Sequence, residues 1–191
     1  MRALPSDDQR ELAAVLRRLF AAECPSSVAR AYRDSGTVPV ALWKALADAG
    51  VFGLAVAEQH GGSGKSLCDL GVFAVEAGRA LCPTAVHNTT LAALAIAGFG
   101  NDAARTAWLP GLCSGEHRAT TALCGARDAA VIAPTLSATR APNGWRLDGA
   151  VDFVVDADGA DLLVASADAG GGIVVVVVET AASGICWSRC A

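Results

Sequence analysis

The sequence predicts an α+β protein: an N-terminal all-helical bundle domain, about residues 1–116, followed by an antiparallel β domain, about residues 117–191, that resembles an incomplete barrel. Apolar residues recur at helical spacing in the first part, and short β-prone runs bounded by turn residues replace them in the second. A hydrophobic fraction of 53% in 191 residues is ample for burying a core. No internal repeat or low-complexity linker separates the two halves.

The helix predictions rest on caps as well as on spacing. Ser6 and Gln9 form a capping box ahead of apolar residues that continue to Phe20. A second helix opens at Pro39 and stops at Gly50. Three further helices are predicted, from Ser66 to Leu81, from Asn88 to about Gly98, and from Asn101 or Asp102 to Leu109, where Pro110 breaks the last one.

The β half is predicted from turn signals and alternation. The stretch "NGWRLDGAVDFVV", residues 143–155, holds an Asn-Gly and an Asp-Gly pair, both hairpin signals, with Trp145 and Leu147 alternating between them. The runs "DLLVAS" and "GIVVVVVE" follow as two more strands, separated by a Gly-rich turn.

Charge and composition exclude several classes of protein. A formal net charge of -4, with scattered Lys and Arg, gives no footprint for nucleic acid. The N-terminus lacks a signal-peptide apolar region, and the longest aliphatic run, residues 173–178, is too short to span a bilayer, so a soluble, cytoplasmic protein without membrane contact is expected. Seven cysteines without a C-x-x-C pair disfavour a metal site or a disulfide framework.

The stretch "QHGGSGKSLCD", residues 59–69, looks like a phosphate-binding loop, but its spacing fails. A P-loop needs a glycine five positions before the Gly-Lys-Ser/Thr, because that glycine opens the backbone nest. Gln59 occupies that position. Several predicted helices also precede the loop, whereas a P-loop follows an early parallel strand. A P-loop NTPase is therefore a remote alternative.

The helical half resembles the N-terminal domain of the acyl-CoA dehydrogenase family. The stretches "ALWKALADAGVFGLAVAEQHGGSGKSLCDLG" and "AWLPGLCSGE" carry the resemblance. The matching positions, in order, are Trp43, Leu46, Gly50, Glu58, Gly61, Gly62, Gly64, Asp69, Glu76, Gly78, Pro83, Leu109, Pro110, Ser114 and Gly115, while Ala57 replaces the usual proline. The resemblance implies that the glycine loop is a structural turn between two helices and that Lys65 is solvated.

The β half resembles the middle domain of the same family, which supplies much of its flavin site. In "GWRLDGAVDFVVDADGADLLVASA", residues 144–167, Phe153 stands where the flavin-contacting tryptophan is usual, and Val155 where a hydroxyl is usual. The segment "TTALCGARDAAV", residues 120–131, takes the place of the loop that holds flavin and thioester. The resemblance implies cofactor-binding residues at Leu123, Cys124, Gly125, Phe153, Val154 and Val155.

The resemblance implies an FAD-dependent oxidoreductase that dehydrogenates the α,β bond of an acyl-CoA in fatty acid or sterol side-chain degradation. None of Glu58, Glu76, Glu116 and Glu179 matches the family's catalytic base, so no catalytic residue is assigned. The sequence ends within the predicted β domain and covers about half of a typical member, as a fragment or a shortened subunit would. The alternative is a non-catalytic subunit with a degraded flavin site, and we expect a homo-oligomer or a pairing with a fuller homologue.

Overall fold

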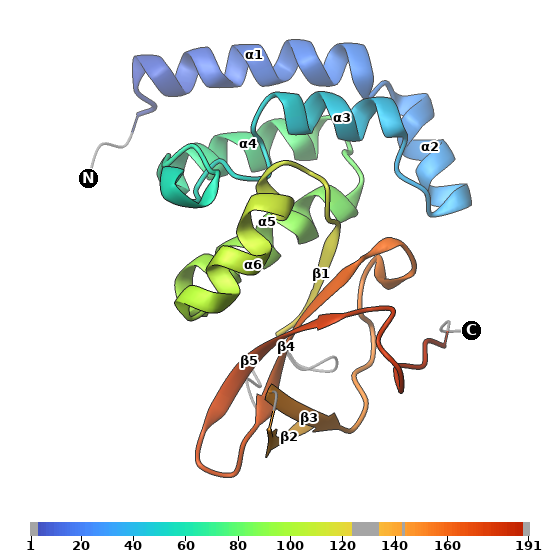
Figure 1. Cartoon of the computed structure of the whole chain (residues 1–191). Coiled ribbons are helices and arrows are strands. Elements are labelled where there is room, and N and C mark those ends of the chain that lie inside the picture. Colours follow the sequence, from blue (N-terminus) through green and yellow to red (C-terminus); the bar gives the residue numbers. More distant parts are fainter. Residues whose placement is uncertain (1–3, 124–133, 143, 189–191) are drawn as a thin grey trace.

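The structure is a computed structural model that describes residues 4–123, 134–142 and 144–188. Figure 1 shows the helices gathered at one end of the molecule and the strands at the other, which confirms the predicted α+β class. The described elements are α1 (Asp7–Glu23), α2 (Ser26–Ser35), α3 (Val40–Asp48), η1 (Glu58–His60), α4 (Leu67–Arg79), α5 (Thr84–Phe99), α6 (Asp102–Cys113), β1 (Ala119–Ala122), β2 (Leu136–Ala141), β3 (Gly144–Asp148), η2 (Ala157–Gly159), β4 (Leu162–Asp168) and β5 (Ile173–Glu179).

The predicted caps at Ser6 and Gly50 are confirmed. The Ser6 hydroxyl accepts a hydrogen bond from the Gln9 amide, and the Gln9 side chain accepts one from the Ser6 amide. At the end of α3, Gly50 has φ +67°, and its neighbour Val51 donates its amide to the Leu46 carbonyl at 3.1 Å. This wrap of the chain around a left-handed glycine satisfies carbonyls that the helix end would leave unpaired.

One helix was not predicted, and another begins earlier than predicted. Helix α2 was absent from the sequence prediction. It is only ten residues long, none of them is buried, and it packs on the helical core through Val28 and Tyr32, too few apolar residues to establish a helical period. Helix α5 begins at Thr84 after Pro83, not at Asn88. Its residues are apolar on nearly every side because the helix is central, so periodicity marks neither end.

The prediction that Pro110 ends the last helix is wrong. Helix α6 continues through Pro110 to Cys113. A proline removes one backbone hydrogen bond from a helix. The final turn persists because it buries Leu112 completely and Cys113 almost completely, and because Ser114 donates its amide to the Pro110 carbonyl at 3.0 Å.

The five described strands form one mixed sheet, and the purely antiparallel arrangement that the sequence predicted needs correction. Strand β4 pairs with β5 in antiparallel register along its whole length. It pairs in parallel with β1, and over its last two residues with β2, which continues as an antiparallel hairpin into β3. Alternation along a sequence identifies strands but carries no information on their direction.

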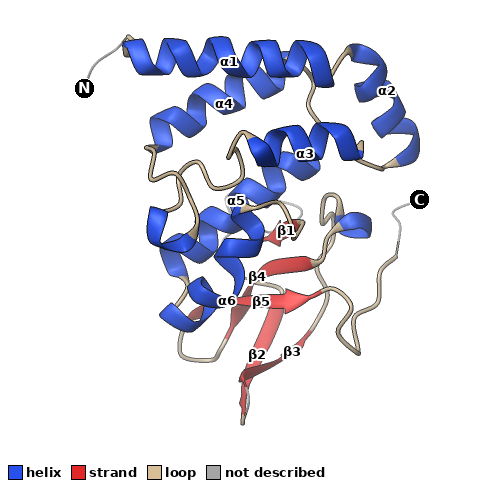
Figure 2. Ribbon diagram, turned by 45° about the horizontal axis from the view of Figure 1, so that its top comes forward, coloured by secondary structure: helices blue, strands red, loops and turns tan. Residues whose placement is uncertain are grey.

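A buried threonine joins the helical part to the sheet. The Thr89 hydroxyl on α5 accepts from the Ala119 amide at 3.1 Å and donates to the Ala119 carbonyl at 3.2 Å. Thr89 is fully buried, and Ala119 is the first residue of β1. Figures 1 and 2 both show β1 emerging beside α5, so this contact sets where the sheet begins relative to the helices.

Candidate functional site

The backbone N–H groups in and just after the glycine turn at residues 61–64 donate hydrogen bonds to carbonyl groups of the chain itself. The Ser63 amide donates to the Gly53 carbonyl at 2.9 Å, the Gly64 amide to the Val56 carbonyl at 2.8 Å, and the Lys65 amide to the Leu54 carbonyl at 2.9 Å. A phosphate-binding loop must present these N–H groups to the ligand. They are all engaged here, so the turn is structural.

The same turn needs glycine for steric reasons. A Cβ on Gly62 would lie 2.5 Å from the Val56 carbonyl carbon and 2.6 Å from the Gly53 oxygen. Gly61 and Gly64 adopt φ +86° and +61°, a region that favours glycine. The side chain of Lys65 is exposed, as the resemblance implied.

Asp69 in the first turn of α4 completes this region. Its carboxylate accepts from the Ser66 hydroxyl at 2.6 Å, from the Ser66 amide at 2.9 Å, and from the Gln9 side chain on α1 at 3.0 Å. These hydrogen bonds, the one from the Ser66 hydroxyl first, lower the pKa of Asp69. The aspartate therefore ties α1 to α4.

Trp43 on α3 anchors the turn that leads into the sheet. Its indole N–H donates to the Gly115 carbonyl at 2.7 Å, and its ring lies 4.3 Å from that of Phe52. The Arg118 guanidinium also lies over the Trp43 ring, 4.8 Å from its centroid. A Cβ on Gly115, which has φ +74°, would come within 2.9 Å of Ala47. The contact between Trp43 and Gly115 therefore explains, on structural grounds, why position 43 is a tryptophan and position 115 a glycine.

The glutamates considered as bases do not form a catalytic site. Glu76 is buried on α4, where Arg17 bonds it at 2.6 Å and 3.1 Å and Arg79 at 3.1 Å. The hydrogen bond from Arg17 is the main cause that lowers the pKa of Glu76, so this carboxylate stays ionised and links α1 to α4. The remaining three, Glu58, Glu116 and Glu179, are exposed at the surface.

The chain leaves the sheet at Gly149 instead of forming the second hairpin that the Asp-Gly pair predicted. Gly149 has φ +129°, and the residues up to Asp156 form no strand. Phe153 and Asp156 both adopt left-handed φ values, +57° and +59°. These two bends leave the Phe153 side chain 66% exposed and that of Val155 52% exposed, while Val154 packs against the core of the sheet.

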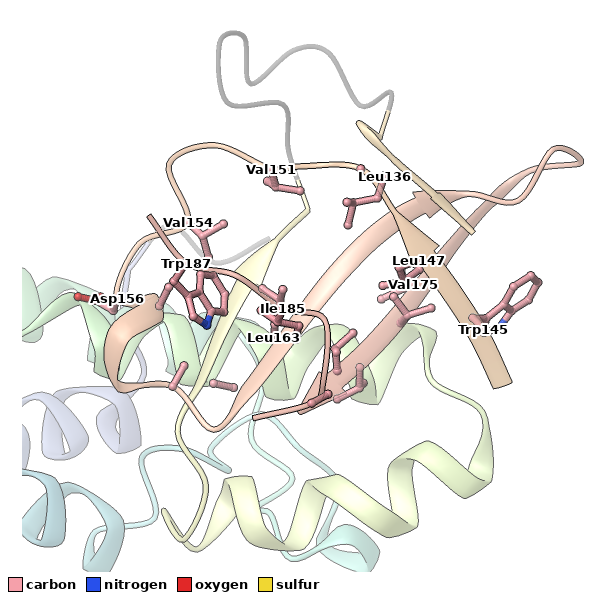
Figure 3. A pocket seen from close by; sticks show the side chains of 18 of the residues that line it. Leu136, Trp145, Leu147, Val151, Val154, Asp156, Leu163, Val175, Ile185 and Trp187 are labelled. Carbon is pink, nitrogen blue, oxygen red and sulfur yellow. The ribbon is translucent and has the colours of Figure 1, made fainter. Parts of the chain in front are cut away.

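A hollow of about 2070 Å³ opens beside this segment. Apolar side chains from β3, from β5, from residues 185–187 and Val154 line it (Figure 3). Phe153 lines it as well. Ligand cavities for small molecules usually enclose about 300–1,000 Å³. The hollow is therefore larger than one small ligand requires, and its volume alone does not identify an occupant.

The structure brings together only part of the predicted cofactor-binding set. Phe153 and Val154 line the hollow, whereas Val155 and Leu123 do not. Leu123 follows β1 and is half-buried against the core between helices and sheet. Cys124 and Gly125 lie outside the described residues.

Comparison with known proteins decides the family. Residues 6–116, more than half of the chain, match the family model for the acyl-CoA dehydrogenase N-terminal domain. The chain belongs to the acyl-CoA dehydrogenase family. A curated relative, the (2S)-methylsuccinyl-CoA dehydrogenase of Cereibacter sphaeroides, is 40% identical over 81 residues, which make up 41% of this chain and 15% of that protein.

Solved structures extend the likeness to the sheet. A variant of the Tcur3481-Tcur3483 steroid ACAD is 34% identical with a TM-score of 0.87, over 96% of this chain and 51% of that one. A glutaryl-CoA dehydrogenase from Mycobacterium smegmatis is 27% identical with a TM-score of 0.80, over 95% of this chain and 48% of its own. The ChsE4-ChsE5 complex from Mycobacterium tuberculosis, at 24% identity and a TM-score of 0.81 over 97% and 50%, shows the same fold. This acyl-CoA dehydrogenase family member thus spans about half the length of these solved relatives.

The family suggests FAD, and the described residues fit one aspect of that cofactor. The exposed ring of Phe153 offers an apolar face of the kind on which a flavin ring stacks. No buried side-chain polar atom in the described part of the chain lacks a partner, and the Val155 carbonyl already accepts from the Thr120 hydroxyl at 2.6 Å. The described side chains therefore supply stacking surface and no spare buried donor for the flavin's polar edge.

Among the residues that the structure describes, no group of three His, Cys, Asp or Glu side chains is placed to hold a metal ion. None of the described helices is long and apolar enough to span a membrane.

Sequence reasoning missed three residues around the candidate segment. Thr120, Tyr32 and Asn88 all bond to residues 155–156 from other elements. These contacts join positions 35 to 124 apart in the sequence, so no local pattern reveals them.

Proposed function

We propose that this chain forms one wall of the flavin and thioester cleft of an FAD-dependent acyl-CoA dehydrogenase. The observation that carries the proposal is the 34% identity to a steroid ACAD over 96% of the chain. The substrate proposed is an acyl-CoA thioester with a fatty or sterol side-chain acyl group. The proposed helical domain, residues 1–116, scaffolds the cleft, and the β domain, residues 117–191, faces the flavin. The proposed location is the cytoplasm.

The residues of this chain have positioning roles in that proposal. Phe153 and Val154 supply the apolar face, and the backbone at Leu123, Cys124 and Gly125 supplies polar contacts. Bound FAD supplies a hydride acceptor for the hydrogen that leaves the β carbon of the acyl group. A carboxylate must remove the α proton. None of the described glutamates lines the hollow, and no glutamate of this chain matches the family's base, so we propose that a fuller polypeptide of the same family supplies it.

We also propose an oligomer, either of this chain or with a fuller acyl-CoA dehydrogenase homologue. Strand β5 pairs with β4, and among the described strands it has no partner at its other edge. Its first six residues, "IVVVVV", carry no charge that would discourage pairing, and Glu179 at its end is its one charged residue. The names of two solved relatives, Tcur3481-Tcur3483 and the ChsE4-ChsE5 complex, each pair two components.

The second candidate function is a non-catalytic subunit with a degraded flavin site. It is supported by the absence of any spare buried side-chain donor among the described residues and by Val155 at a position where the family has a hydroxyl. Loss of a net hydrogen bond costs about 0.5–1.5 kcal/mol, so several losses lower cofactor affinity by orders of magnitude.

A titration with FAD, followed by an assay with acyl-CoA thioesters and an artificial electron acceptor, separates the candidates. The first function predicts saturable binding that quenches flavin fluorescence, and acceptor reduction once a fuller homologue supplies the base. No FAD binding to the chain, with turnover only at the homologue's own flavin, would support the second function instead.

Replacing Phe153 with tryptophan is expected to strengthen FAD binding about two- to tenfold, because a larger aromatic surface stacks on the flavin. Phe153→Leu is the control, since it keeps an apolar side chain on the same backbone but removes the ring. The measurement is the FAD dissociation constant of the three proteins. Equal or weaker binding by the tryptophan variant would contradict the placement of residue 153 against the flavin.

A further inference from the structure

A polar cluster lies between the helices and the candidate flavin-facing segment. Asp156, which lies at the rim of the hollow in Figure 3, accepts a hydrogen bond from the Tyr32 hydroxyl on α2. The Asn88 amide on α5 donates to the other Asp156 oxygen at 3.0 Å. Two helices thus hold one carboxylate of the β part of the chain.

The preceding peptide is held as well. The Val155 carbonyl accepts from the Thr120 hydroxyl on β1 at 2.6 Å and from the Asn88 amide at 3.4 Å. Side chains from α2, α5 and β1 therefore converge on two consecutive residues. These contacts fix the position of the peptide between Val155 and Asp156.

The backbone needs such support. Phe153 and Asp156 have φ +57° and +59°, and neither is a glycine. A non-glycine residue in the left-handed region is strained and persists only where the surroundings enforce it. Asp tolerates this conformation better than Phe, because its short polar side chain bonds locally. The contacts at residues 155–156 are the visible constraint that keeps the segment bent and Phe153 turned outward.

We propose that Tyr32, Asn88 and Asp156 form a latch by which the helices position the flavin-facing segment, residues 153–155. The role rests on the proposed function, because it assigns the latch to presenting Phe153 to FAD. Tyr32 and Asp156 are positioning residues that act through the backbone and touch no cofactor themselves.

The first test needs no cofactor. Tyr32 is the single tyrosine of the chain, so tyrosinate absorbance at high pH reports on this residue alone. Burial, and then the hydrogen bond to Asp156, raise the pKa of Tyr32 from 10.0 to about 12. The charged side chain facing the phenol is Asp156, and α5 presents the neutral Thr84 hydroxyl at 3.3 Å.

The raised pKa of Tyr32 makes the stability of the fold depend on pH in the alkaline range. Because the folded pKa exceeds the unfolded value, the protonated phenol favours the native state. Its contribution is complete below the unfolded pKa of 10.0 and is lost as the pH rises through about 12. We expect a spectrophotometric midpoint near 12 for the native chain and a lower midpoint for Asp156→Asn, which removes the charge but keeps an acceptor. A native midpoint at the unfolded value would overturn the latch.

The second test connects the latch to FAD. Tyr32→Phe is expected to weaken FAD binding about fivefold or more, since a hydrogen bond to a charged group is lost. Thr180→Val is the matched control, because the Thr180 hydroxyl also makes one hydrogen bond, to the Ala160 carbonyl at 2.6 Å, and does not line the hollow. Thermal melting of both variants establishes that each is folded.

Two aspartate variants test whether the backbone position is what matters. Asn adopts left-handed φ values readily and can still accept from Tyr32, whereas Ala can do neither. Asp156→Asn should therefore lose less FAD affinity than Asp156→Ala. Equal losses in these two variants, or an equal loss in Tyr32→Phe and Thr180→Val, would overturn the positioning role. Failure of the wild-type chain to bind FAD would overturn the proposed function and with it the flavin-facing role, while the tyrosine titration would still decide whether the latch forms.

Discussion

Replacing Gly62 with alanine is expected to destabilise the fold by about 4 kcal/mol or more, the largest effect of any single substitution considered for this chain. The added Cβ would lie 2.5 Å from one backbone carbon and 2.6 Å from a second backbone oxygen, and neither can rotate away as a side chain can. Relief would require the turns at residues 53–56, after α3, to move, which breaks the hydrogen bonds that Ser63, Gly64 and Lys65 donate to them. Urea unfolding followed by circular dichroism measures the loss.

Two control variants separate this steric clash from the general effect of replacing a glycine with alanine and from a role of Lys65 in ligand binding. Gly71→Ala lies on the exposed side of α4 with nothing near the new Cβ, so it should be neutral or stabilising by up to about 1 kcal/mol. Lys65→Ala removes an exposed side chain and should change the free energy of unfolding by less than about 0.5 kcal/mol. A stable, ATP-binding Gly62→Ala protein would contradict the structural role of the turn.

Trp43→Ala is expected to cost about 3–5 kcal/mol, the second largest effect. The indole is 7% exposed, stacks at 4.3 Å on Phe52 and donates to the Gly115 carbonyl. Its removal leaves a cavity and an unpaired carbonyl in the turn that feeds β1. Loss of tertiary structure should therefore spread from α3 to the start of the sheet.

Trp43→Phe divides the effect into its parts. Phe keeps most of the apolar volume but cannot donate to Gly115, so it should lose less than the alanine variant and more than about 1 kcal/mol. Trp187→Ala is the surface control, because Trp187 is 41% exposed. If Trp43→Ala and Trp187→Ala cost the same in urea unfolding, the anchoring role of Trp43 is wrong.

Local chemistry explains which parts of the fold could be predicted from sequence. The capping box at Ser6 and the left-handed stop at Gly50 are contained in four or five consecutive residues, and both are present. The extension of α6 past Pro110 is different, because burial of Leu112 by other elements outweighs one missing backbone hydrogen bond. The residues around Pro110 alone do not indicate that burial outweighs the lost hydrogen bond.

The sheet shows the same limit. The strands at residues 144–148, 162–168 and 173–179 were visible as alternating or continuous apolar runs, whereas β1 and β2 were not predicted. The parallel pairing of β1 with β4 was not, because it joins residues about 43 positions apart through register alone. The Asp-Gly pair at 148–149 also misled, since Gly149 serves an exit from the sheet and not a hairpin.

At the candidate site, the family resemblance named the cofactor-binding residues, and the structure shows which of the described ones line the hollow. Phe153 and Val154 line the hollow, whereas Val155 has its carbonyl in the latch and its side chain in solvent. The direction of these side chains depends on the left-handed bends at 153 and 156, and those bends depend on Tyr32 and Asn88 in distant helices. Only three-dimensional contacts carry that information.

Hydrogen exchange with and without FAD or ATP distinguishes a structural glycine turn and a flavin-facing segment from a phosphate-binding loop, because it reports where each ligand contacts the chain. We expect FAD to slow amide exchange in peptides covering residues 150–157, and we expect neither ligand to change exchange at residues 58–66. Protection of residues 58–66 by ATP, with residues 150–157 unaffected by FAD, would contradict both expectations.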